Sequence, residues 1–379
     1  MGDSIPMAPP LRVAVTLEQC WHRVPGGVAS TALEAVRALS ARGEVDLVGV
    51  SALHRAPAPE PWTPSIPVRA LPLTRLALYE SWHRTRHPAV ERATGPIDVI
   101  YVTGMAMPPR TAPLVVTVHD LAFLSDPGHS TKRGVKFFTR AVELARAEAD
   151  LVCCPSQDTL DDCIAFGFDP GRLRLVPWGV DAEQVGPADV ERVRATYRLG
   201  RPYVLWTGTV EPRKNLPTLL EAFRALDRHG VELVLVGPKG WNEDLGAHLG
   251  KAAGRVRVLG FVPTDDLRAL YAGAEVFCLP SLREGFGMPL LEAMAQGAPA
   301  ITSSGTATAE VAGDAAVLVD PLDAPALTEA IAHVLDDPAE QDRRRLASLA
   351  RAAEYPWART AVDLEAAFAD VAEVAELQP

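Results

Sequence analysis

The sequence predicts an α/β protein built from two doubly wound domains, and three observations support this prediction. The chain of 379 residues is long enough for two domains. Short apolar runs rich in valine alternate with longer helical patterns, and such runs are typical of strands buried on both faces of a parallel sheet. The alternation occurs in both halves of the chain, so we expect one such sheet in each half.

Each predicted strand is a short, nearly continuous apolar run. In the first half these runs are residues 11–16, 45–50, 97–102, 114–118 and 151–154. In the second half they are residues 203–208, 231–237, 256–260, 276–280, 299–302 and 316–320. Helical patterns fill the gaps, such as the run from Val28 that ends on Gly43. Residues 53–72 are rich in proline and are predicted to form a surface loop.

The domain boundary is expected between residues 178 and 200, where no strand pattern occurs and Pro187 interrupts the chain. We therefore expect domains at residues 1–180 and 181–356, followed by a separate helix at residues 357–379. Open α/β sheets bind ligands at the carboxyl ends of their strands. Two such domains facing each other make a cleft, and functional residues are expected directly after strands.

Composition limits the classes of function. The net charge of -11 argues against binding to nucleic acid, because a polyanion requires a basic surface. Residues 1–180 carry equal numbers of acidic and basic side chains, so the negative charge lies in the second half. The five cysteines include no C-x-x-C pair and are interpreted as buried thiols in a reducing compartment. With no signal peptide pattern and no long apolar run, we expect a cytoplasmic protein, soluble or attached to a membrane surface.

The strongest motif is the segment from Glu284 to Gly297, EGFGMPLLEAMAQG. Pro289 suits the first turn of a helix and Gly297 its end. A helix that begins here directs its N–H groups and the positive end of its dipole into the cleft, which favours phosphate binding. Glu284 precedes this helix and Glu292 lies about one turn into it, so the two carboxylates could accept hydrogen bonds from hydroxyls on either side of a phosphate. The alternative is a buried corner with two solvated glutamates.

A second motif, TGTVEPRKNL, follows a strand that ends at Gly208. It places Arg213 and Lys214 directly before a helix. Adjacent cations at this edge of the sheet fit a diphosphate. The alternative is a solvated basic turn.

The first half offers two weaker candidates. His119 directly follows a strand and could face the cleft, or it could be an ordinary histidine at the rim of the core. Gly26 and Gly27 open a helix after the first strand and resemble a turn that approaches a phosphate.

Several motifs of other chemistries are absent from the sequence. It contains no G-x-G-x-x-G, no phosphate-binding loop with Lys, no G-x-S-x-G and no H-E-x-x-H. Because Asp-x-Asp is also absent, we expect no metal site and no bound cofactor. Arg213, Lys214 and helix dipoles would then neutralise a diphosphate.

These motifs resemble the retaining glycosyltransferases of family four, which have the GT-B fold of two Rossmann-like domains. The resemblance covers nearly the whole chain and is strongest from Glu284 to Pro299. It extends to residues 208–215, 259–262, 308–316 and 176–180. It implies an acceptor-binding first domain, a second domain that binds a nucleotide sugar, and a final helix that crosses back to the first domain.

The resemblance also implies a role for each candidate residue. Arg213 and Lys214 would neutralise the leaving diphosphate, Glu284 would bind the donor sugar, and Glu292 would bind the ribose. His119 would approach the donor sugar and Gly27 the phosphate. The remaining donor-binding candidates are Gly26, Gly208, Gly260, Val262, Phe286, Gly287, Met288, Pro289 and Leu290. Transfer would retain the anomeric configuration, with the leaving phosphate itself accepting the proton of the acceptor, so Glu284 is not expected to be a general base.

The donor is expected to be GDP-mannose, because residues 119–127 and 208–215 look most like the mannosyltransferase members. A UDP-sugar is the alternative donor. The acceptor is expected to be a glycolipid, a glycan or a small molecule. Residues 71–92 and 131–146 combine cations with aromatic side chains such as Trp82 and Phe137. They could form basic faces resting on anionic lipid, or ordinary helices with snorkelling cations.

Two other classes of function remain open at this point. One is a non-transferase enzyme of the same fold, an epimerase or a phosphorylase. The other is a silent protein that binds a nucleotide sugar without turnover. Fold alone does not separate these classes.

Overall fold

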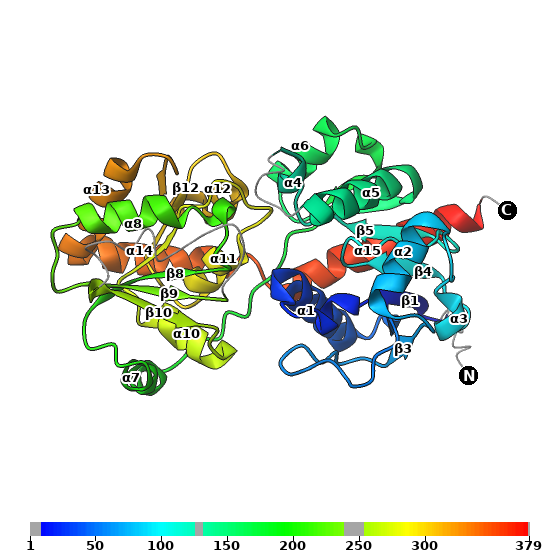
Figure 1. The fold of residues 1–379 in the computed structure, drawn as a ribbon, viewed down its shortest axis with the longest axis horizontal. Coiled ribbons are helices and arrows are strands. Elements are labelled where there is room, and N and C mark those ends of the chain that lie inside the picture. The colour runs from blue at the N-terminus through cyan, green and yellow to red at the C-terminus, as the bar shows by residue number, and fades with distance from the viewer. Residues whose placement is uncertain (1–8, 126–131, 239–253, 378–379) are drawn as a thin grey trace, which may run out of the picture.

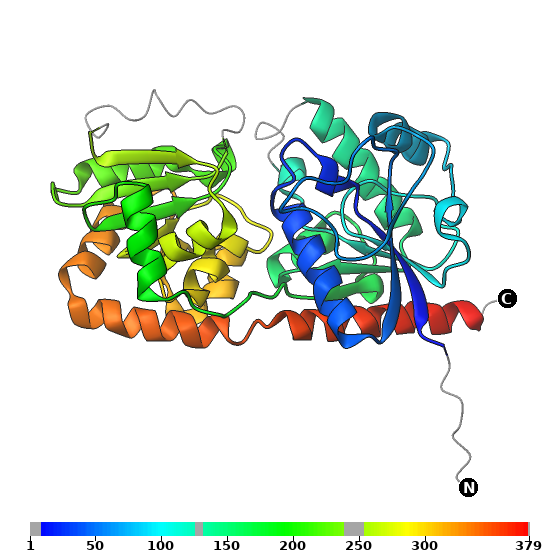
Figure 2. The same ribbon diagram turned by 90° about the horizontal axis from the view of Figure 1, so that it is seen from below.

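The computed structural model describes residues 9–125, 132–238 and 254–377. Two α/β units lie side by side, and the chain passes once from the first to the second before its last helix returns (Figure 1). Seen from below, α14 (Pro338–Ala352) and α15 (Trp357–Glu376) follow one another along the base of both units (Figure 2).

The first unit contains a parallel sheet that has seven strands in the described residues, in the order β3-β2-β1-β4-β5-β6-β7. The strands are β1 (Leu11–Thr16), β2 (Val45–Ser51), β3 (Val68–Ala70), β4 (Val99–Val102), β5 (Leu114–Thr117), β6 (Leu151–Cys154) and β7 (Leu173–Leu175). The connecting helices are η1 (Glu18–Trp21), α1 (Gly26–Arg42), α2 (Arg75–Arg84), α3 (Glu91–Thr94), α4 (Ala122–Ser125), α5 (Lys132–Glu148), α6 (Gln157–Ala165) and η3 (Pro170–Arg172).

The second unit contains a parallel sheet of six described strands in the order β10-β9-β8-β11-β12-β13. The strands are β8 (Tyr203–Thr207), β9 (Glu232–Val236), β10 (Val256–Gly260), β11 (Val276–Leu279), β12 (Ala300–Ser303) and β13 (Val317–Val319). Its helices are α7 (Pro187–Thr196), η4 (Pro212–Lys214), α8 (Leu216–Ala225), α10 (Thr264–Ala272), α11 (Met288–Ala295), α12 (Ala307–Ala312), η6 (Gly313–Ala315) and α13 (Ala324–Asp336), followed by α14.

Each sheet has one point at which the strand order reverses, between β1 and β4 in the first unit and between β8 and β11 in the second. Ligands of open α/β sheets bind outside the carboxyl ends of the strands at this switch point. The loops after β8 and β11 carry the strongest motifs of the sequence. The fold therefore places both motifs where such a sheet binds its ligand.

The last helix packs on the first unit rather than the second. Ala361, Leu364, Ala367 and Phe368 of α15 are buried, and the Phe368 ring lies 5.3 Å from the ring of Tyr101 on β4. Arg42 of α1 pairs with Glu365 at 2.8 Å. This apolar stripe ties the carboxyl end of the chain to the first sheet.

The two edge strands of the first sheet escaped the sequence analysis. Strand β3 lies inside the segment 53–72 that was predicted to be a loop, so that prediction is wrong for Val68–Ala70. Strand β7 was not predicted. Both have three residues, and none of these residues is buried. They therefore lack the continuous apolar pattern on which the other strands were recognised.

Candidate active site

Three charged side chains form the centre of the site. Arg213 and Lys214 lie in η4 after β8, and Glu284 lies in the loop after β11. The Lys214 Nζ donates to Glu284 Oε1 at 2.6 Å, and an Arg213 nitrogen donates to Glu284 Oε2 at 2.6 Å. The structure thus joins two motifs that are about seventy residues apart in the chain.

Two further groups complete this cluster, and the sequence analysis missed both. Ser281 donates its hydroxyl to Glu284 Oε1 at 2.6 Å, and Glu211 accepts from Arg213 at 2.8 Å. Arg213 also donates to the backbone oxygen of Arg283 at 2.9 Å. Two cations and two carboxylates make the cluster neutral overall. Among the described residues, however, two of the five N–H donors of Arg213 and two of the three of Lys214 have no partner, so they are available to a ligand.

The electrostatics keep Glu284 and Arg213 ionised. Burial raises the pKa of Glu284, but the charges of Arg213 and Lys214 and the hydrogen bonds from Lys214 and Ser281 lower it to about 2. Burial lowers the pKa of Arg213, but the carboxylates of Glu284, Asp120 and Glu211 together raise it well above its usual value. A carboxylate this acidic is a poor general base near neutral pH.

Glu292 lies in α11 in a different environment. Its Oε2 accepts a hydrogen bond from the Tyr271 hydroxyl at 3.0 Å, and that hydroxyl lies 2.9 Å from Thr207 Oγ1. Burial raises the pKa of Glu292 to about 7, and the opposing effect of the Tyr271 hydrogen bond is smaller. The negative charge of Glu34, on α1 of the first unit, also raises it. Tyr271 is a positioning residue that the sequence analysis did not identify.

Helix α11 begins beside this cluster without a side-chain cap. Gly287 precedes it with φ of 101°, and Pro289 occupies its first turn. A Cβ at Gly287 would lie 2.6 Å from the Thr308 side chain, so only glycine fits there. Phe286 and Leu290 are buried, whereas the side chains of Met288 and Pro289 are partly exposed. The open N-terminus of α11 can receive an anion.

His119 follows β5 in the first unit. Its Nε2 lies 2.8 Å from the backbone oxygen of Thr103, so this nitrogen carries the proton and donates it. Burial lowers the pKa of His119 and outweighs the contrary effects of the Thr103 carbonyl and the Asp120 carboxylate. The ring lies 5.6 Å from that of Trp178. A neutral ring held in this way presents Nδ1 as a hydrogen-bond acceptor.

The loop that carries Glu284 touches the first unit directly. A Cβ at Gly285 would lie 1.8 Å from the backbone oxygen of His119. The Gly285 oxygen accepts hydrogen bonds from Ser156 at 2.6 Å and from Thr159 at 3.0 Å. The absence of a side chain at Gly285 is therefore what allows the two units to approach here. The contact places His119 and Glu284 on facing segments.

Other contacts between the units surround this point. Arg283 forms an ion pair with Asp162 of α6. The Glu310 carboxylate accepts from the backbone N–H of Gln157 at 2.8 Å, and it thereby caps α6 from the other unit.

The glycine candidates fall into two groups. A Cβ at Gly26 or Gly27, where α1 begins, would meet no atom within 4 Å, so this helix N-terminus is open. Gly208 instead follows β8 and Gly260 ends β10, and a third glycine lies against both. Gly237, which the sequence analysis missed, donates to the Gly260 oxygen at 2.8 Å, and its Cβ would lie 1.9 Å from the Gly208 oxygen. Val262, two residues after Gly260 in the chain, is buried.

The aromatic side chains proposed for membrane contact pack against other residues of the first unit. Trp82 is 1% exposed, and the Phe137 ring stacks on His83 at 4.5 Å. The side chains of Lys132 and Arg133, like Thr131, lie outside the described residues. These contacts favour the alternative of ordinary helices for the aromatic side chains. None of the helices in the described part of the chain has the length and apolar character needed to cross a bilayer.

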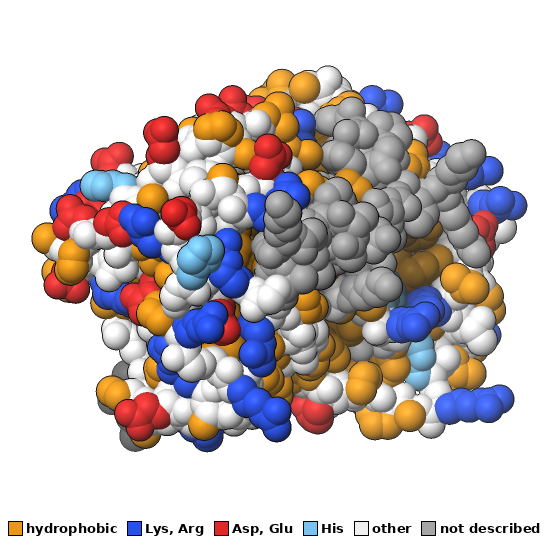
Figure 3. Space-filling model, turned by 60° about the vertical axis from the view of Figure 1, so that its left-hand side comes forward, with side chains coloured by type: hydrophobic (Ala, Val, Ile, Leu, Met, Phe, Trp, Pro, Cys, Tyr) orange, Lys and Arg blue, Asp and Glu red, His pale blue; other side chains and the backbone are white. Residues whose placement is uncertain are grey.

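Acidic and basic side chains are interspersed over the described part of the face drawn in Figure 3, with no broad area of basic side chains alone. Within the ranges that the structure describes, His, Cys, Asp and Glu side chains do not gather in any group of three that could hold a metal ion.

Comparison with known proteins identifies the family. Residues 189–353 match the model of glycosyl transferases group 1, and residues 25–184 match that of glycosyltransferase family 4. The O-antigen chain mannosyltransferase B of Escherichia coli is 33% identical over 261 residues, which cover 66% of this chain and 68% of that protein. The chain belongs to this family of glycosyltransferases. The family predicted from the sequence is therefore confirmed.

Two other relatives show how the similarity extends. The MMP alpha-(1->4)-mannosyltransferase of Mycolicibacterium hassiacum is 35% identical, over 64% of this glycosyltransferase and 60% of its own length. A D-inositol 3-phosphate glycosyltransferase of Corynebacterium glutamicum is 29% identical, over 68% and 66%. The matches thus span about three fifths to two thirds of the relatives' lengths.

Solved structures confirm the GT-B fold. Anabaena Alr3699/HepE, in complex with UDP and glucose, superposes with a TM-score of 0.75 at 19% identity and covers 95% of this chain and 100% of its own. WaaG, a glycosyltransferase involved in lipopolysaccharide biosynthesis, superposes with a TM-score of 0.73 at 18% identity, over 94% and 99%. Both proteins share the fold of this chain along nearly their whole length.

Proposed function

We propose that this glycosyltransferase moves a hexose, namely mannose from GDP-mannose, to a hydroxyl of a glycolipid, glycan or small-molecule acceptor. Transfer proceeds with retention of the anomeric configuration and without a metal ion, and the protein works in the cytoplasm. The single observation that supports this most strongly is the cluster of Arg213, Lys214 and Glu284 at the switch point of the second sheet.

The cluster meets the main chemical requirement of the reaction. When the bond to the sugar breaks, negative charge grows on the diphosphate. Donors that are already oriented stabilise such charge best, because they need no reorganisation during the reaction. Arg213 is fixed by hydrogen bonds to Glu284, Glu211 and the Arg283 backbone. The open N-termini of α11 and α1 supply further N–H groups.

The other polar groups serve the sugar and the nucleoside. Glu284, ionised at neutral pH, accepts hydrogen bonds from sugar hydroxyls with the lone pairs that its three donors leave free. Glu292 accepts from the ribose. His119 accepts from the donor sugar through Nδ1. The leaving phosphate takes the acceptor proton, which agrees with the weak basicity of Glu284.

The choice of mannose rests on relatives, two of which are named as mannosyltransferases. Other relatives are named as D-inositol 3-phosphate glycosyltransferases. A UDP-sugar is therefore the second candidate donor.

The test is isothermal titration with GDP, UDP and ADP in EDTA, followed by the matching sugar nucleotides. Selective binding of GDP supports the mannosyl proposal. Selective binding of UDP or ADP retains the transferase and overturns mannose, and binding only with added Mg²⁺ overturns the metal-free mechanism. Arg228→Ala, which removes an exposed arginine of the same unit, is the control and should bind like the wild type.

Product analysis with the donor alone separates the other classes. An epimer of the donor sugar would indicate an epimerase, and phosphate-dependent release of a sugar phosphate would indicate a phosphorylase. Binding without turnover, across a panel of acceptors, would indicate a silent binding protein.

A further inference from the structure

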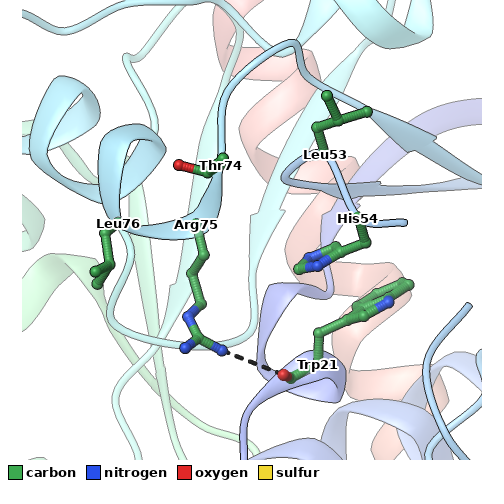
Figure 4. Close-up of a pocket in the computed structure, with 6 residues that line it drawn as sticks. All are labelled: Trp21, Leu53, His54, Thr74, Arg75 and Leu76. Carbon is green, nitrogen blue, oxygen red and sulfur yellow. Dashed lines mark hydrogen bonds between the residues drawn. The ribbon is translucent and has the colours of Figure 1, made fainter. Parts of the chain in front are cut away.

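A pocket of about 320 Å³ opens on the first unit, and no residue of the charged cluster lines it. Figure 4 shows its lining, which consists of Trp21, Leu53, His54, Thr74, Arg75 and Leu76. These residues follow β1, β2 and β3. The pocket therefore lies at the same carboxyl edge of the first sheet as His119, which follows β5.

Arg75 is the main charged group of this pocket. It is partly buried, and its guanidinium donates to the backbone oxygen of Trp21 at 3.2 Å. In the described part of the chain, no carboxylate lies within ion-pair distance of it, whereas Arg86 and Arg110 of the same unit each pair with an acid. A partly desolvated guanidinium without a counter-ion favours an anionic ligand.

The acid of this neighbourhood, Glu18, is already engaged. Its buried carboxylate accepts from the backbone N–H of Ala52 at 2.7 Å and from His54 Nε2 at 2.9 Å. The His54 ring stacks on Trp21 with centroids 4.7 Å apart and planes within 5°. Trp21 is fixed in turn by a bond from its indole nitrogen to the Ala56 oxygen at 3.0 Å. His54 therefore has a fixed orientation, and its Nδ1 has no hydrogen-bond partner among the described residues.

Two further described neighbours of Arg75, His22 and Tyr79, add no negative charge. His22 lies 2.9 Å from the Tyr79 hydroxyl, and burial, together with the charges of Arg75 and His54, lowers the pKa of His22 to about 4. Helix α2 has ten residues and begins at Arg75, and the side chain of Thr74 does not cap it. Its free N–H groups point toward the start of the helix, where the dipole also favours an anion.

The rim of the pocket is apolar. Leu53 and Leu76 are each 56% exposed. A ligand that fits both parts carries an anionic group on a carbon skeleton, with the anion against Arg75 and the skeleton against the leucines.

Hydrogen bonds also connect the segment that lines the pocket to His119 in the candidate active site. Thr103 accepts from His119 through its backbone oxygen at 2.8 Å and from Gln19 through its hydroxyl at 2.7 Å. Gln19 and Trp21 belong to the same short helix, η1. A molecule held in the pocket is thus positioned relative to His119 by a continuous hydrogen-bonded segment.

We propose that this pocket binds a phosphate group of the acceptor substrate. The inference rests on the proposed transferase function, and it deepens it by naming the acceptor as a phosphorylated molecule. The phosphate belongs either to a soluble sugar phosphate or to a lipid head group.

The test compares Arg75→Ala with Arg69→Ala, which removes an exposed arginine of β3 with no ion pair in the described residues. Binding of sn-glycerol 3-phosphate and of glycerol is measured by titration calorimetry. We expect the phosphate but not glycerol to bind the wild type and Arg69→Ala, and the affinity of Arg75→Ala to fall about tenfold or more, the scale of one lost charge-assisted hydrogen bond. Arg75→Lys should restore part of the affinity because it keeps the charge without the planar geometry.

Vesicles distinguish the two sources. The phosphate belongs to a lipid if the wild type cosediments with phosphatidylglycerol vesicles but not with phosphatidylcholine vesicles, and if Arg75→Ala abolishes this cosedimentation. Calorimetric binding without cosedimentation assigns the phosphate to a soluble acceptor. Equal binding of sn-glycerol 3-phosphate by Arg75→Ala and the wild type, or binding by neither, overturns the proposal. Thermal unfolding checks that each variant is folded, and Arg75→Gln replaces Arg75→Ala if the latter is not. Titration of the wild type with GDP tests the donor site separately. If the wild type does not bind GDP but still binds sn-glycerol 3-phosphate in an Arg75-dependent way, the proposed function fails while the pocket proposal stands.

Discussion

Replacing Lys214 by alanine tests the central charge of the site. The Lys214 side chain is 8% exposed, and its Nζ contacts Glu284 at 2.6 Å. Removing it deletes one cation that faces the diphosphate but leaves Glu284 paired with Arg213 and Ser281. The loss should therefore fall on the leaving group rather than on the integrity of the loop.

The size of the effect follows from these contacts. One charge-assisted hydrogen bond to the diphosphate contributes about 1.5–3 kcal/mol, so the Kd of GDP should rise by roughly 10- to 150-fold. Because the charge on the diphosphate is larger in the transition state, kcat/KM should fall further, by about 10²–10³. The free energy of unfolding should fall by less than the roughly 3–5 kcal/mol that a fully broken buried ion pair costs, because Arg213 still compensates Glu284.

The assay measures release of the nucleoside diphosphate from the donor, together with titration of GDP and GMP. The wild type should prefer GDP to GMP, and Lys214→Ala should lose most of that preference. Ser281→Ala is the matched control, since it also removes one donor to the same oxygen of Glu284 but no cation. Full activity in Lys214→Ala, or an equal loss in Ser281→Ala, would refute the proposed role.

Four further predictions use the surroundings of this cluster. Burial raises the pKa of Glu292 to about 7, and ionisation replaces the O–H donor of the acid by a second accepting oxygen. GDP affinity should therefore rise as the pH increases through 7, and this rise should be smaller in Glu292→Gln in titrations from pH 6 to 8. The same shift means that the contribution of Glu292 to stability is present below its unfolded pKa and is lost as the pH rises through 7, so urea unfolding should show a smaller decline with pH in Glu292→Gln. Gly285→Ala should lower kcat/KM by about tenfold or more, because its Cβ would lie 1.8 Å from the His119 oxygen and push apart the two units; wild-type kinetics in this variant would contradict the contact. Gly27→Ala, whose Cβ meets no atom within 4 Å, should unfold at the wild-type temperature but weaken GDP binding, and unchanged binding would remove this helix N-terminus from the donor site.

The sequence predicts the interior of both sheets because those strands are buried on both faces. Residues 11–16 and 151–154 coincide with β1 and β6, and α1 ends before Gly43, which adopts a left-handed φ of 73°. The edge strands β3 and β7 could not be recognised, since each is short and lacks buried residues. A pattern of apolar residues in the sequence indicates which positions are buried, so a strand without buried residues leaves no such pattern.

The site was predictable to the extent that single segments define it. Gly, Pro and acid signals in one register indicated the start of α11 and the two glutamates, and a basic pair after a strand indicated η4. Pairing between distant segments could not be read from the chain. No local pattern shows that Glu211 binds Arg213, that Tyr271 holds Glu292, or that Gly285 packs on the other unit.

The pairing within the cluster changes how its affinity for a diphosphate is explained. A basic pair on its own would attract the ligand by net charge, but Arg213 and Lys214 are balanced by Glu211 and Glu284. The attraction must then come from local geometry, namely the unused N–H donors of the two cations and the open N-termini of α11 and α1. Such short-range contacts in a partly buried site are screened less by salt than surface charges are. The low pKa of Glu284 follows from the same arrangement, since the carboxylate that orients both cations must stay ionised for them to remain in place when the leaving group develops its charge.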